Sequence, residues 1–431
     1  MTHREAPPVN PAEAPALPIP RKTPAAFRRF LASNAFESIA DNSVRTLLPV
    51  IAVSALGAGT AEIGVLNALG LGAFLVFGLP IGGLVDRLPK LGVMRAADLV
   101  RAVAVLAVPG LFLLDALALW QVLLAAALLG IADVFFTSAT GAWLPTVVGT
   151  EELGIAYARL QRVSTLASVG SPAVATTLLK VLAAPLVLAL AGIGYLFSAL
   201  LLPRFAGDDP APDSDPRPRF WSSIAQGISL AVHHPALRAL LLSNMLLNAA
   251  VMLGNSVLAV YVISSLGYSV AAFAMIGTLS ALGGLLASII APRLLGRWGI
   301  GRLKIAASLG CVPAVGVLAL AQHLPGPVLG WVAAQSLIWS CMLVLATVAG
   351  AGVVPQLCAP SKLATVMAAH RFFTLGVMPV ASLAGGLAAV HLGITPILWT
   401  WAALAGLSAL PILLSPLRSW HLGPEPHGTN T

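Results

Sequence analysis

The chain has 431 residues, of which 58% are hydrophobic and 9% are charged, with a formal net charge of +8. A soluble domain carries about 25% charged residues, so this composition excludes a globular surface that faces water. Apolar stretches recur from residue 30 to residue 415, and each can cross a hydrocarbon core of about 30 Å. Their hydrophobicity is continuous rather than alternating, which excludes a membrane barrel. The sequence therefore predicts an all-α membrane protein.

Residues 1–27 are polar and rich in proline, and we expect a disordered cytosolic tail there. Twelve transmembrane helices are predicted at 29–55, 61–85, 92–114, 117–141, 154–180, 183–203, 236–263, 269–293, 301–321, 326–350, 364–390 and 394–415. They divide into an N-terminal six-helix bundle over 28–204 and a C-terminal six-helix bundle over 236–416. A cytosolic linker with an amphipathic helix is expected over 205–235, and a second cytosolic tail over 417–431.

The basic residues gather in the connections that are cytosolic if the N-terminus lies inside, and Lys304 is counted among them. Of 24 basic residues, only Arg45, Arg101 and Lys180 fall outside this zone. This positive-inside bias predicts that both termini are cytosolic and that the chain lies in a bacterial inner membrane. Topology therefore explains the net charge, and we expect no nucleic-acid partner.

Two pairs of segments are similar between the halves. "LPTVVGTEEL" at 144–153 parallels "VPQLCAPSKL" at 354–363, an offset of 210, and "LVDR" at 84–87 parallels "IAPR" at 290–293, an offset of 206. Such similarity favours duplication of a six-helix unit, a common construction among transporters. The expected fold therefore consists of two six-helix pseudo-repeats.

The segment "GGLVDRLPKL" between the second and third helices resembles the G-x-x-x-D-R-x-G-R-R loop of the major facilitator superfamily. The matching positions are Gly82, Asp86, Arg87 and Lys90. The segment departs from the pattern at Pro89 and Leu91, and the second departure removes one cation. The resemblance implies the two-bundle major facilitator fold, and it implies that this loop acts as a conformational latch.

A closer resemblance is to the branch that includes the enterobactin exporter and the transmembrane secretion effectors. The similar stretches are "DLVRA" (98–102), "GIADVFFTSATGAWLPTVV" (130–148), "IAQGISLAVHHPALRALLL" (224–242) and "RFFTLGVMPVASLAGGLAAVHLG" (371–393). Exporters of the superfamily also carry a glycine-rich pattern on helix five. Here small residues keep its spacing, and Ser171 and Pro172 are expected to bend that helix. The resemblance implies export of small organic molecules.

Of 16 acidic residues, 15 lie in the first 215 positions and the last is Glu425, so the C-terminal bundle contains no carboxylate. Glu37, Asp41 and Arg45 share one face of the first helix because they are spaced by four. Charges inside a bilayer are costly and usually functional. We hypothesise that Asp41 takes and releases a coupling proton, assisted by Glu37 and tuned by Arg45. The alternative is a static ion pair between Asp41 and Arg45.

Asp133 on the fourth helix is a second coupling candidate, or else a structural partner of the motif loop. Asp98 and Arg101 are one turn apart on the third helix and are expected to form a structural pair. His370 and Arg371 are expected to begin the eleventh helix at the cytosolic surface, where they would cap it, and the alternative is a proton relay.

Polar residues that could line a substrate cavity lie mainly in the C-terminal bundle. They are Asn34, Asn244, Asn248, Asn255, Gln335 and Trp339. Amides and an indole suit a partly apolar substrate that forms hydrogen bonds, although the same residues could instead bond or pack between helices. No motif indicates a cofactor, a metal site or a nucleotide site. Nothing in the sequence requires more than a monomer.

The sequence thus predicts a secondary-active efflux transporter of drug-like or siderophore-like molecules, driven by proton antiport through alternating access. An importer or a lysophospholipid flippase on the same scaffold is the alternative. A membrane sensor or enzyme that transports nothing is a remote alternative, because no buried catalytic cluster is visible and we expect no enzymatic activity.

Overall fold

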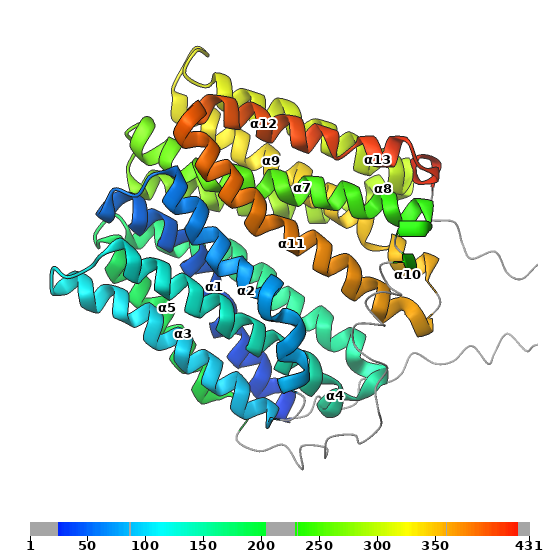
Figure 1. Ribbon diagram of the computed structural model, residues 1–431, viewed down its shortest axis with the longest axis horizontal. Helices are drawn as coiled ribbons and strands as arrows, with labels where there is room; N and C mark the ends of the chain where they lie inside the picture. Colours follow the sequence, from blue (N-terminus) through cyan, green and yellow to red (C-terminus); the bar gives the residue numbers. More distant parts are fainter. Residues whose placement is uncertain (1–24, 86–87, 204–228, 231, 359, 421–431) are drawn as a thin grey trace, which may run out of the picture.

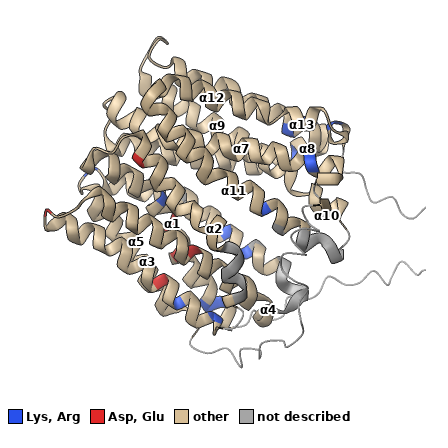
Figure 2. Ribbon diagram, in the orientation of Figure 1, with Lys and Arg blue, Asp and Glu red and all other residues tan. Residues whose placement is uncertain are grey.

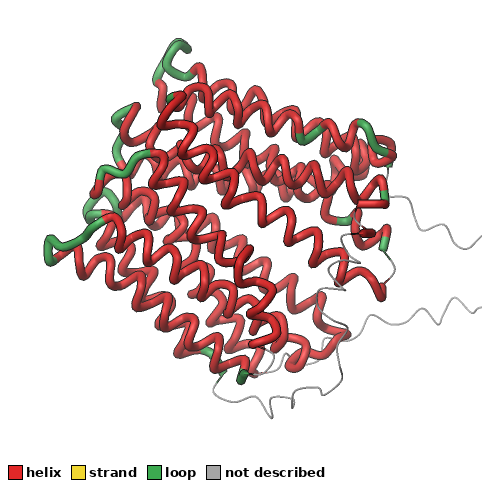
Figure 3. Tube along the Cα trace, viewed as in Figure 1, coloured by secondary structure: helices red, strands yellow, loops and turns green. Residues whose placement is uncertain are grey.

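The computed structural model describes residues 25–85, 88–203, 229–230, 232–358 and 360–420. Within these residues every regular element is a helix, and no strand occurs (Figure 3). Ten of the described helices are long and apolar enough to cross a membrane. The predicted all-α membrane fold is confirmed.

The described chain forms two groups of helices that lie side by side (Figure 1). The first group, here called the N-half, contains α1 (Ala25–Leu56), α2 (Thr60–Val85), α3 (Lys90–Leu113), α4 (Leu119–Leu178) and α5 (Ala184–Leu201). The second group, here called the C-half, contains α7 (Pro235–Val260), a π-helical turn (Tyr261–Ser265), α8 (Val270–Leu320), α9 (Val328–Ala351), α10 (Val353–Leu357), α11 (Pro360–Leu392), α12 (Ile394–Leu407), α13 (Leu410–Leu413) and a 3₁₀ turn (Pro416–Ser419).

Helix α4 runs through the two segments that were expected to form the fourth and fifth helices. Near its start, a carboxylate oxygen of Asp133 lies within 4.8 Å of one of Glu37 on α1. Near its end, the hydroxyl of Ser171 donates a hydrogen bond to the carbonyl of Ile39, also on α1. A straight helix would separate positions 133 and 171 by about 57 Å, at about 1.5 Å per residue. Helix α4 therefore turns back on itself and forms two arms.

Helix α8 is likewise divided into two arms. Gly299 has φ 73° and ψ 175°, which lie outside the helical region, and a positive φ is readily adopted by glycine because it has no Cβ. The arms on either side of Gly299 correspond to the segments 269–293 and 301–321 expected as separate helices. Counting two arms each for α4 and α8, the long helices of the described chain are consistent with the twelve predicted.

Helices of the two halves begin at positions that differ by 210. The paired starts are Ala25 and Pro235, Thr60 and Val270, and Ala184 and Ile394. The turn after the first helix of each half contains a glycine with positive φ, Gly57 at 66° and Gly267 at 70°. The sequence parallel between 144–153 and 354–363 follows this offset. The parallel between 84–87 and 290–293, with an offset of 206, does not follow it.

Two buried hydrogen bonds also repeat at this offset. The hydroxyl of Ser198 on α5 donates to Asp98 on α3 at 2.6 Å. The hydroxyl of Ser408, just after α12, donates to Ser308 in the second arm of α8 at 2.9 Å. Both bonds join residues 100 positions apart, and their members differ by 210. The same helix contact is thus built twice, with a carboxylate in the N-half where the C-half has a hydroxyl.

The two halves meet tightly at the end of the molecule that holds the connections 57–59 and 266–269, here called the loop end. The Thr60 hydroxyl donates to the Gly386 carbonyl at 3.0 Å, joining α2 to α11. A Cβ placed on Gly64 would lie 3.2 Å from the Cα of Gly386, so no side chain fits between these helices. A buried apolar cluster from both halves, including Val53 and Val260, completes the closure. The loop end is therefore sealed in this conformation.

Two sequence expectations about helix ends are wrong. Lys304 is expected in a cytosolic connection, but it is 1% exposed because the second arm of α8 packs it against its neighbours. His370 is expected at the start of a helix, but α11 already begins at Pro360 and carries His370 in its interior. Both residues lie within the predicted helices 301–321 and 364–390, and the sequence does not show how those helices pack around them.

Helix α1 begins at Ala25, inside the segment expected to be a tail. Phe27 and Phe30 explain this early start, because both are buried and the Phe30 ring packs edge-on against Trp143 at 5.0 Å. Most of the expected linker and nearly all of both tails lie outside the described residues.

Candidate functional site

The guanidinium of Arg101 on α3 is the centre of a buried cluster of charges. It lies 3.0 Å from Glu37 of α1, 3.4 Å from Asp98 of its own helix and 2.9 Å from Asp133 of α4. Arg101 itself is 1% exposed. One cation, fully enclosed by protein, therefore holds carboxylates from three helices together.

Asp41 joins the same cluster through Tyr195 of α5. The Tyr195 hydroxyl donates to Asp41 at 2.5 Å, and the Arg101 guanidinium lies 5.5 Å from the centre of the Tyr195 ring. Carboxylate oxygens of Glu37, Asp41 and Asp133 lie within 4.8 Å of one another. Carboxyl groups this close repel one another when all are ionised, so they favour a shared proton or a cation.

Neutral side chains fix the buried members of the cluster. Asn34 donates to Glu37 at 2.8 Å from one turn earlier in α1. Ser198 donates to Asp98, and its hydroxyl lies 2.9 Å from that of Ser33. These bonds satisfy the carboxylates that face away from solvent, as buried polar groups require. Glu37 and Asp98 therefore form the fixed, inner side of the cluster.

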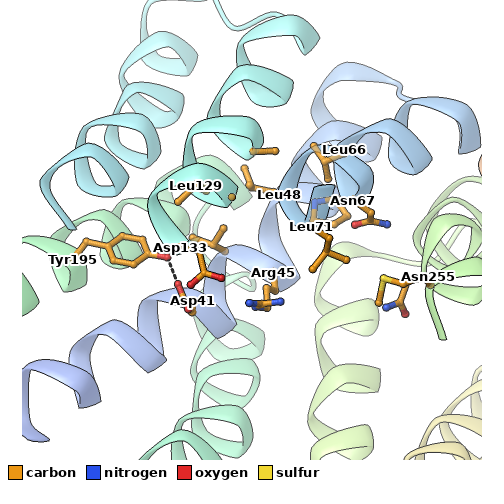
Figure 4. Close-up of a pocket in the computed structure, with 16 residues that line it drawn as sticks. Asp41, Arg45, Leu48, Leu66, Asn67, Leu71, Leu129, Asp133, Tyr195 and Asn255 are labelled. Atoms are coloured by element: carbon orange, nitrogen blue, oxygen red, sulfur yellow. Dashed lines mark hydrogen bonds between the residues drawn. The ribbon is translucent and has the colours of Figure 1, made fainter. Parts of the chain in front are cut away.

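Asp133 forms the exposed side of the cluster. Its side chain is 41% exposed, whereas those of Glu37 and Asp98 are 9% and 0% exposed. Asp133, Asp41 and Arg45 line a cavity of about 200 Å³ (Figure 4). A solute in this cavity can reach Asp133 directly, and Asp133 in turn contacts Arg101. The cavity is thus connected to the buried carboxylates through a single guanidinium.

The rest of the cavity wall is mainly apolar and comes mostly from the N-half. The other lining residues are Val44, Leu48, Pro49, Leu66, Asn67, Gly70, Leu71, Ala126, Leu129, Gly130, Tyr195, Met252 and Asn255. Met252 and Asn255 belong to the C-half, and Asn255 lies across the cavity from Asp133 and Asp41 (Figure 4). The cavity therefore lies between the two halves.

Arg45 lines the cavity as an exposed side chain. Asp41 and Arg45 are both described, and their side chains are not within ion-pair distance of each other in this conformation. Figure 2 shows that the acidic residues of the described chain lie in the N-half. The four carboxyl groups of Glu37, Asp41, Asp98 and Asp133 thus outnumber the three guanidinium groups near them, those of Arg101, Arg45 and Arg371.

The polar residues expected in the C-half lie in different surroundings. The Asn248 amide donates to the Thr374 carbonyl at 3.0 Å and joins α7 to α11. Gln335 is buried and accepts a hydrogen bond from Ser336. Trp339 packs edge-on against Trp401 with ring centres 4.8 Å apart. Among the expected cavity residues, Asn255 lines the cavity described here.

The serine and proline expected to bend the fifth helix lie in the second arm of α4. Ser171 bonds to the backbone of α1, and a Cβ on Gly277 of α8 would lie 3.7 Å from Pro172. Ser171 also lines an apolar cavity of about 420 Å³, with Ile39 and Ser43 on its α1 side. Helix α1 therefore separates this apolar cavity from the acidic one.

The expected latch lies largely outside the described residues. Asp86 and Arg87 are not described, Gly82 is part of α2, and Lys90 begins α3.

Sequence reasoning identified the carboxylates but missed the residues that organise them. Asp98 and Arg101 form the expected pair, yet Arg101 also contacts two further helices. The signal available was its unusual position, since Arg101 is one of three basic residues outside the expected cytosolic zone. Tyr195 carried no signal, because a tyrosine in an apolar helix is common at membrane interfaces.

The model of the Major Facilitator Superfamily matches residues 30–376. This chain belongs to that superfamily. Among solved structures, a mutant of the nucleoside transporter NupG superposes with a TM-score of 0.72 at 13% identity, covering 90% of this chain and 99% of that one. A bacterial homologue of the iron transporter ferroportin, in an inward-facing state, gives 0.70 at 16% identity, covering 91% and 98%. The chain is therefore a multi-pass membrane transporter and not an enzyme.

Part of the chain is also similar to a curated relative that is named as an efflux protein. Macrolide efflux protein A of Enterococcus faecalis is 28% identical to this chain over 191 residues, which make up 43% of this chain and 57% of that relative. The chain thus matches about half the length of this curated relative.

Proposed function

We propose that this major facilitator exports apolar, amine-bearing organic molecules in exchange for protons. The charge balance of the N-half cluster carries this proposal. The carboxyl groups of Glu37, Asp41, Asp98 and Asp133 face the guanidinium groups of Arg101 and Arg45, and Arg371 of α11 is near enough to act on the charge of Asp133. If all were ionised, one negative charge would remain uncompensated inside the membrane, which is costly. Without substrate the cluster therefore favours a protonated carboxyl group, and a bound cation can replace that proton.

Asp133 and Asp41 are the groups at which this exchange takes place. Both line the cavity, and Asp133 is the more exposed partner of Arg101. A substrate ammonium beside Asp133 would favour its ionised form, because a nearby opposite charge stabilises a carboxylate. Substrate binding would thus release a proton, and proton binding would release substrate. This competition is the minimum requirement for antiport.

The direction of transport follows from topology. The positive-inside distribution supports a cytosolic location for both termini, in a bacterial inner membrane. The loop end then faces the outside and is sealed by the contact of Thr60 with Gly386. Under this assignment the conformation is the one that loads substrate from the cytosol. Rocking of the two halves would open the loop end and release substrate outward.

The cavity wall indicates the class of substrate. Leu48, Leu66, Leu129 and Met252 supply apolar surface beside the carboxylates, which suits an apolar molecule with one cationic group. The relative named as a macrolide efflux protein makes a macrolide the first compound to test. The volume of about 200 Å³ is below the roughly 300–1,000 Å³ of typical ligand pockets. A macrolide would therefore require the halves to move apart.

The test is uptake of radiolabelled erythromycin into proteoliposomes with an acidic lumen. Because erythromycin is an amine, an acidic lumen also traps it passively, so protein-free liposomes measure that background. We expect uptake above this background that disappears when an ionophore collapses the proton gradient. Uptake equal to that of protein-free liposomes, for erythromycin and for a panel of apolar cations, would overturn the proposal.

A further inference from the structure

Among the residues that the structure describes, the C-half contains a buried cation without a carboxylate partner. Lys304, in the second arm of α8, is 1% exposed. After residue 215 the sequence has one acidic residue, Glu425, which lies outside the described residues. A buried ammonium normally requires a paired negative charge. The carboxylates of the N-half cluster do not pair with Lys304, so the burial of this ammonium needs a separate explanation.

Lys304 is enclosed by neutral groups. Its ammonium donates to the side-chain oxygen of Asn244 on α7 at 2.8 Å and to the carbonyl of Ala346 on α9 at 3.1 Å. A Cβ placed on Gly350 of α9 would lie 2.9 Å from Leu240 and 3.5 Å from the Lys304 nitrogen. The ammonium is thus 1% exposed and bonded to two neutral oxygens, and a proton is the ligand that it can exchange in this setting.

Asn244 connects Lys304 to a second titratable group. The amide nitrogen of Asn244 lies 3.3 Å from Nε2 of His370 on α11. Because Lys304 donates to the amide oxygen, the amide nitrogen must point toward His370, and that nitrogen can only donate. Nε2 of His370 therefore accepts. In this arrangement Lys304 carries the proton, and His370 is neutral with its hydrogen on Nδ1.

A second arrangement satisfies the same three side chains. If the Asn244 amide turns over, its nitrogen donates to a neutral Lys304 amine and its oxygen accepts from Nε2–H of a charged His370. The proton has then left the lysine nitrogen and bonded to the imidazole, and the total charge stays at +1. The amide cannot serve a charged lysine and a charged histidine at once.

We propose that Lys304 and His370 share a single proton through Asn244, which makes this trio a second proton site of the transporter. His370 is partly exposed while Lys304 is buried, so His370 is the point where the proton enters. The trio joins α7, α8 and α11. The neighbouring Arg371 guanidinium lies 5.3 Å from the centre of the Phe74 ring of α2, which places the site next to a contact between the halves.

The charged state of His370 tests this proposal directly. The full-length protein, labelled with ¹⁵N-histidine and held in lipid nanodiscs, gives nuclear magnetic resonance signals that distinguish neutral from charged imidazole. His370 is assigned among the eight histidines as the signal lost in His370→Gln. For the wild type at about pH 6 we expect a neutral ring protonated on Nδ1.

Removal of the Lys304 ammonium should make it easier for the His370 imidazole to take up a proton. In Lys304→Met the charged fraction of His370 is expected to rise by about tenfold, because its proton affinity should rise by about that factor. Arg302→Met is the matched control, since Arg302 is an exposed cation on the same arm of α8, and it should leave His370 unchanged. An unchanged His370 in Lys304→Met would overturn the proposal and leave Lys304 as a fixed structural cation.

A second variant covers the case in which Lys304→Met does not fold. Asn244→Asp provides a carboxylate that can accept from both neighbours, so Lys304 and His370 should be charged together at neutral pH. A neutral His370 in this variant would also overturn the proposal. The spectroscopic result does not depend on transport, so this proposal and the proposed antiport can fail separately.

Discussion

Nη2 of Arg101 lies 2.9 Å from Oδ1 of Asp133, and this contact is where the buried cluster of the N-half reaches the cavity. Arg101 is almost completely buried, whereas the Asp133 side chain is 41% exposed. A change of charge in the cavity therefore acts first on Asp133 and then, through Arg101, on Glu37 and Asp98.

Arg101→Met should strongly destabilise the protein. The substitution leaves Glu37 and Asp98 buried without their cation, and breaking a buried ion pair costs about 3–5 kcal/mol. Thermal unfolding in detergent measures this loss. The double variant Arg101→Met with Glu37→Gln should recover part of it, because one uncompensated carboxylate is removed. Equal stability of Arg101→Met and wild type would contradict the central place given to Arg101.

Asp133→Asn and Asp98→Asn should separate function from stability. Asp133→Asn keeps a polar, partly solvated side chain, so we expect a folded protein whose gradient-driven uptake falls by at least about tenfold, equivalent to about 1.4 kcal/mol. Asp98→Asn changes a fully buried group bound by Arg101 and Ser198, so it should mainly reduce the unfolding temperature.

Asp115→Asn is the control for both substitutions. Asp115 lies at the loop end with φ 52°, a conformation that asparagine also tolerates. This variant should keep both stability and uptake. If Asp115→Asn lost as much uptake as Asp133→Asn, then loss of any acidic residue would impair transport. The buried cluster would then have no special role.

Tyr195→Phe should destabilise the protein by removing the hydrogen bond to Asp41. The lost hydrogen bond of 2.5 Å is made to a carboxylate, and such bonds contribute about 1.5–3 kcal/mol. Tyr261→Phe is a matched control, because its hydroxyl makes a long bond of 3.4 Å to the Leu318 carbonyl. Chemical denaturation should show a larger loss for Tyr195→Phe. Equal losses would mean that the Asp41 contact adds nothing specific.

Gly64→Ala should open the seal at the loop end. A Cβ there would lie 2.7 Å from the Ser382 carbonyl oxygen, and such overpacking costs about 1–3 kcal/mol. With Ile63→Cys as a reporter at a site that is now buried, we expect faster thiol labelling in Gly64→Ala than without it. Gly72→Ala is the control, because its nearest contact would be an ordinary 3.9 Å from Pro379. Slow labelling in both variants would show that the seal tolerates the extra group.

The helical membrane fold could be predicted because a continuous apolar run in a bilayer must satisfy its backbone hydrogen bonds internally, which a helix does. The turns inside α4 and α8 could not be located from composition. Gly299 is one of 40 glycines, and its positive φ becomes visible only in the structure. The positive-inside pattern assigns Lys304 to a cytosolic connection, because basic residues normally gather at the cytosolic helix ends. Its burial depends on Asn244, a residue 60 positions away.

The candidate site was predictable where its residues share one helix. The spacing of Glu37 and Asp41 identified the carboxylate face of α1, because helical periodicity determines which side chains are neighbours. Arg101 and Tyr195 reach this face from α3 and α5. Contacts between helices depend on packing, which a single sequence does not specify.

Proton release on substrate binding tests the proposed exchange most directly. Erythromycin is added to the purified protein in weakly buffered detergent that contains a pH indicator, and binding is measured in parallel. We expect the wild type to release protons as it binds, and Asp133→Asn to release markedly fewer. Binding without proton release by the wild type, or equal release by both proteins, would contradict an exchange of substrate for protons at this cluster.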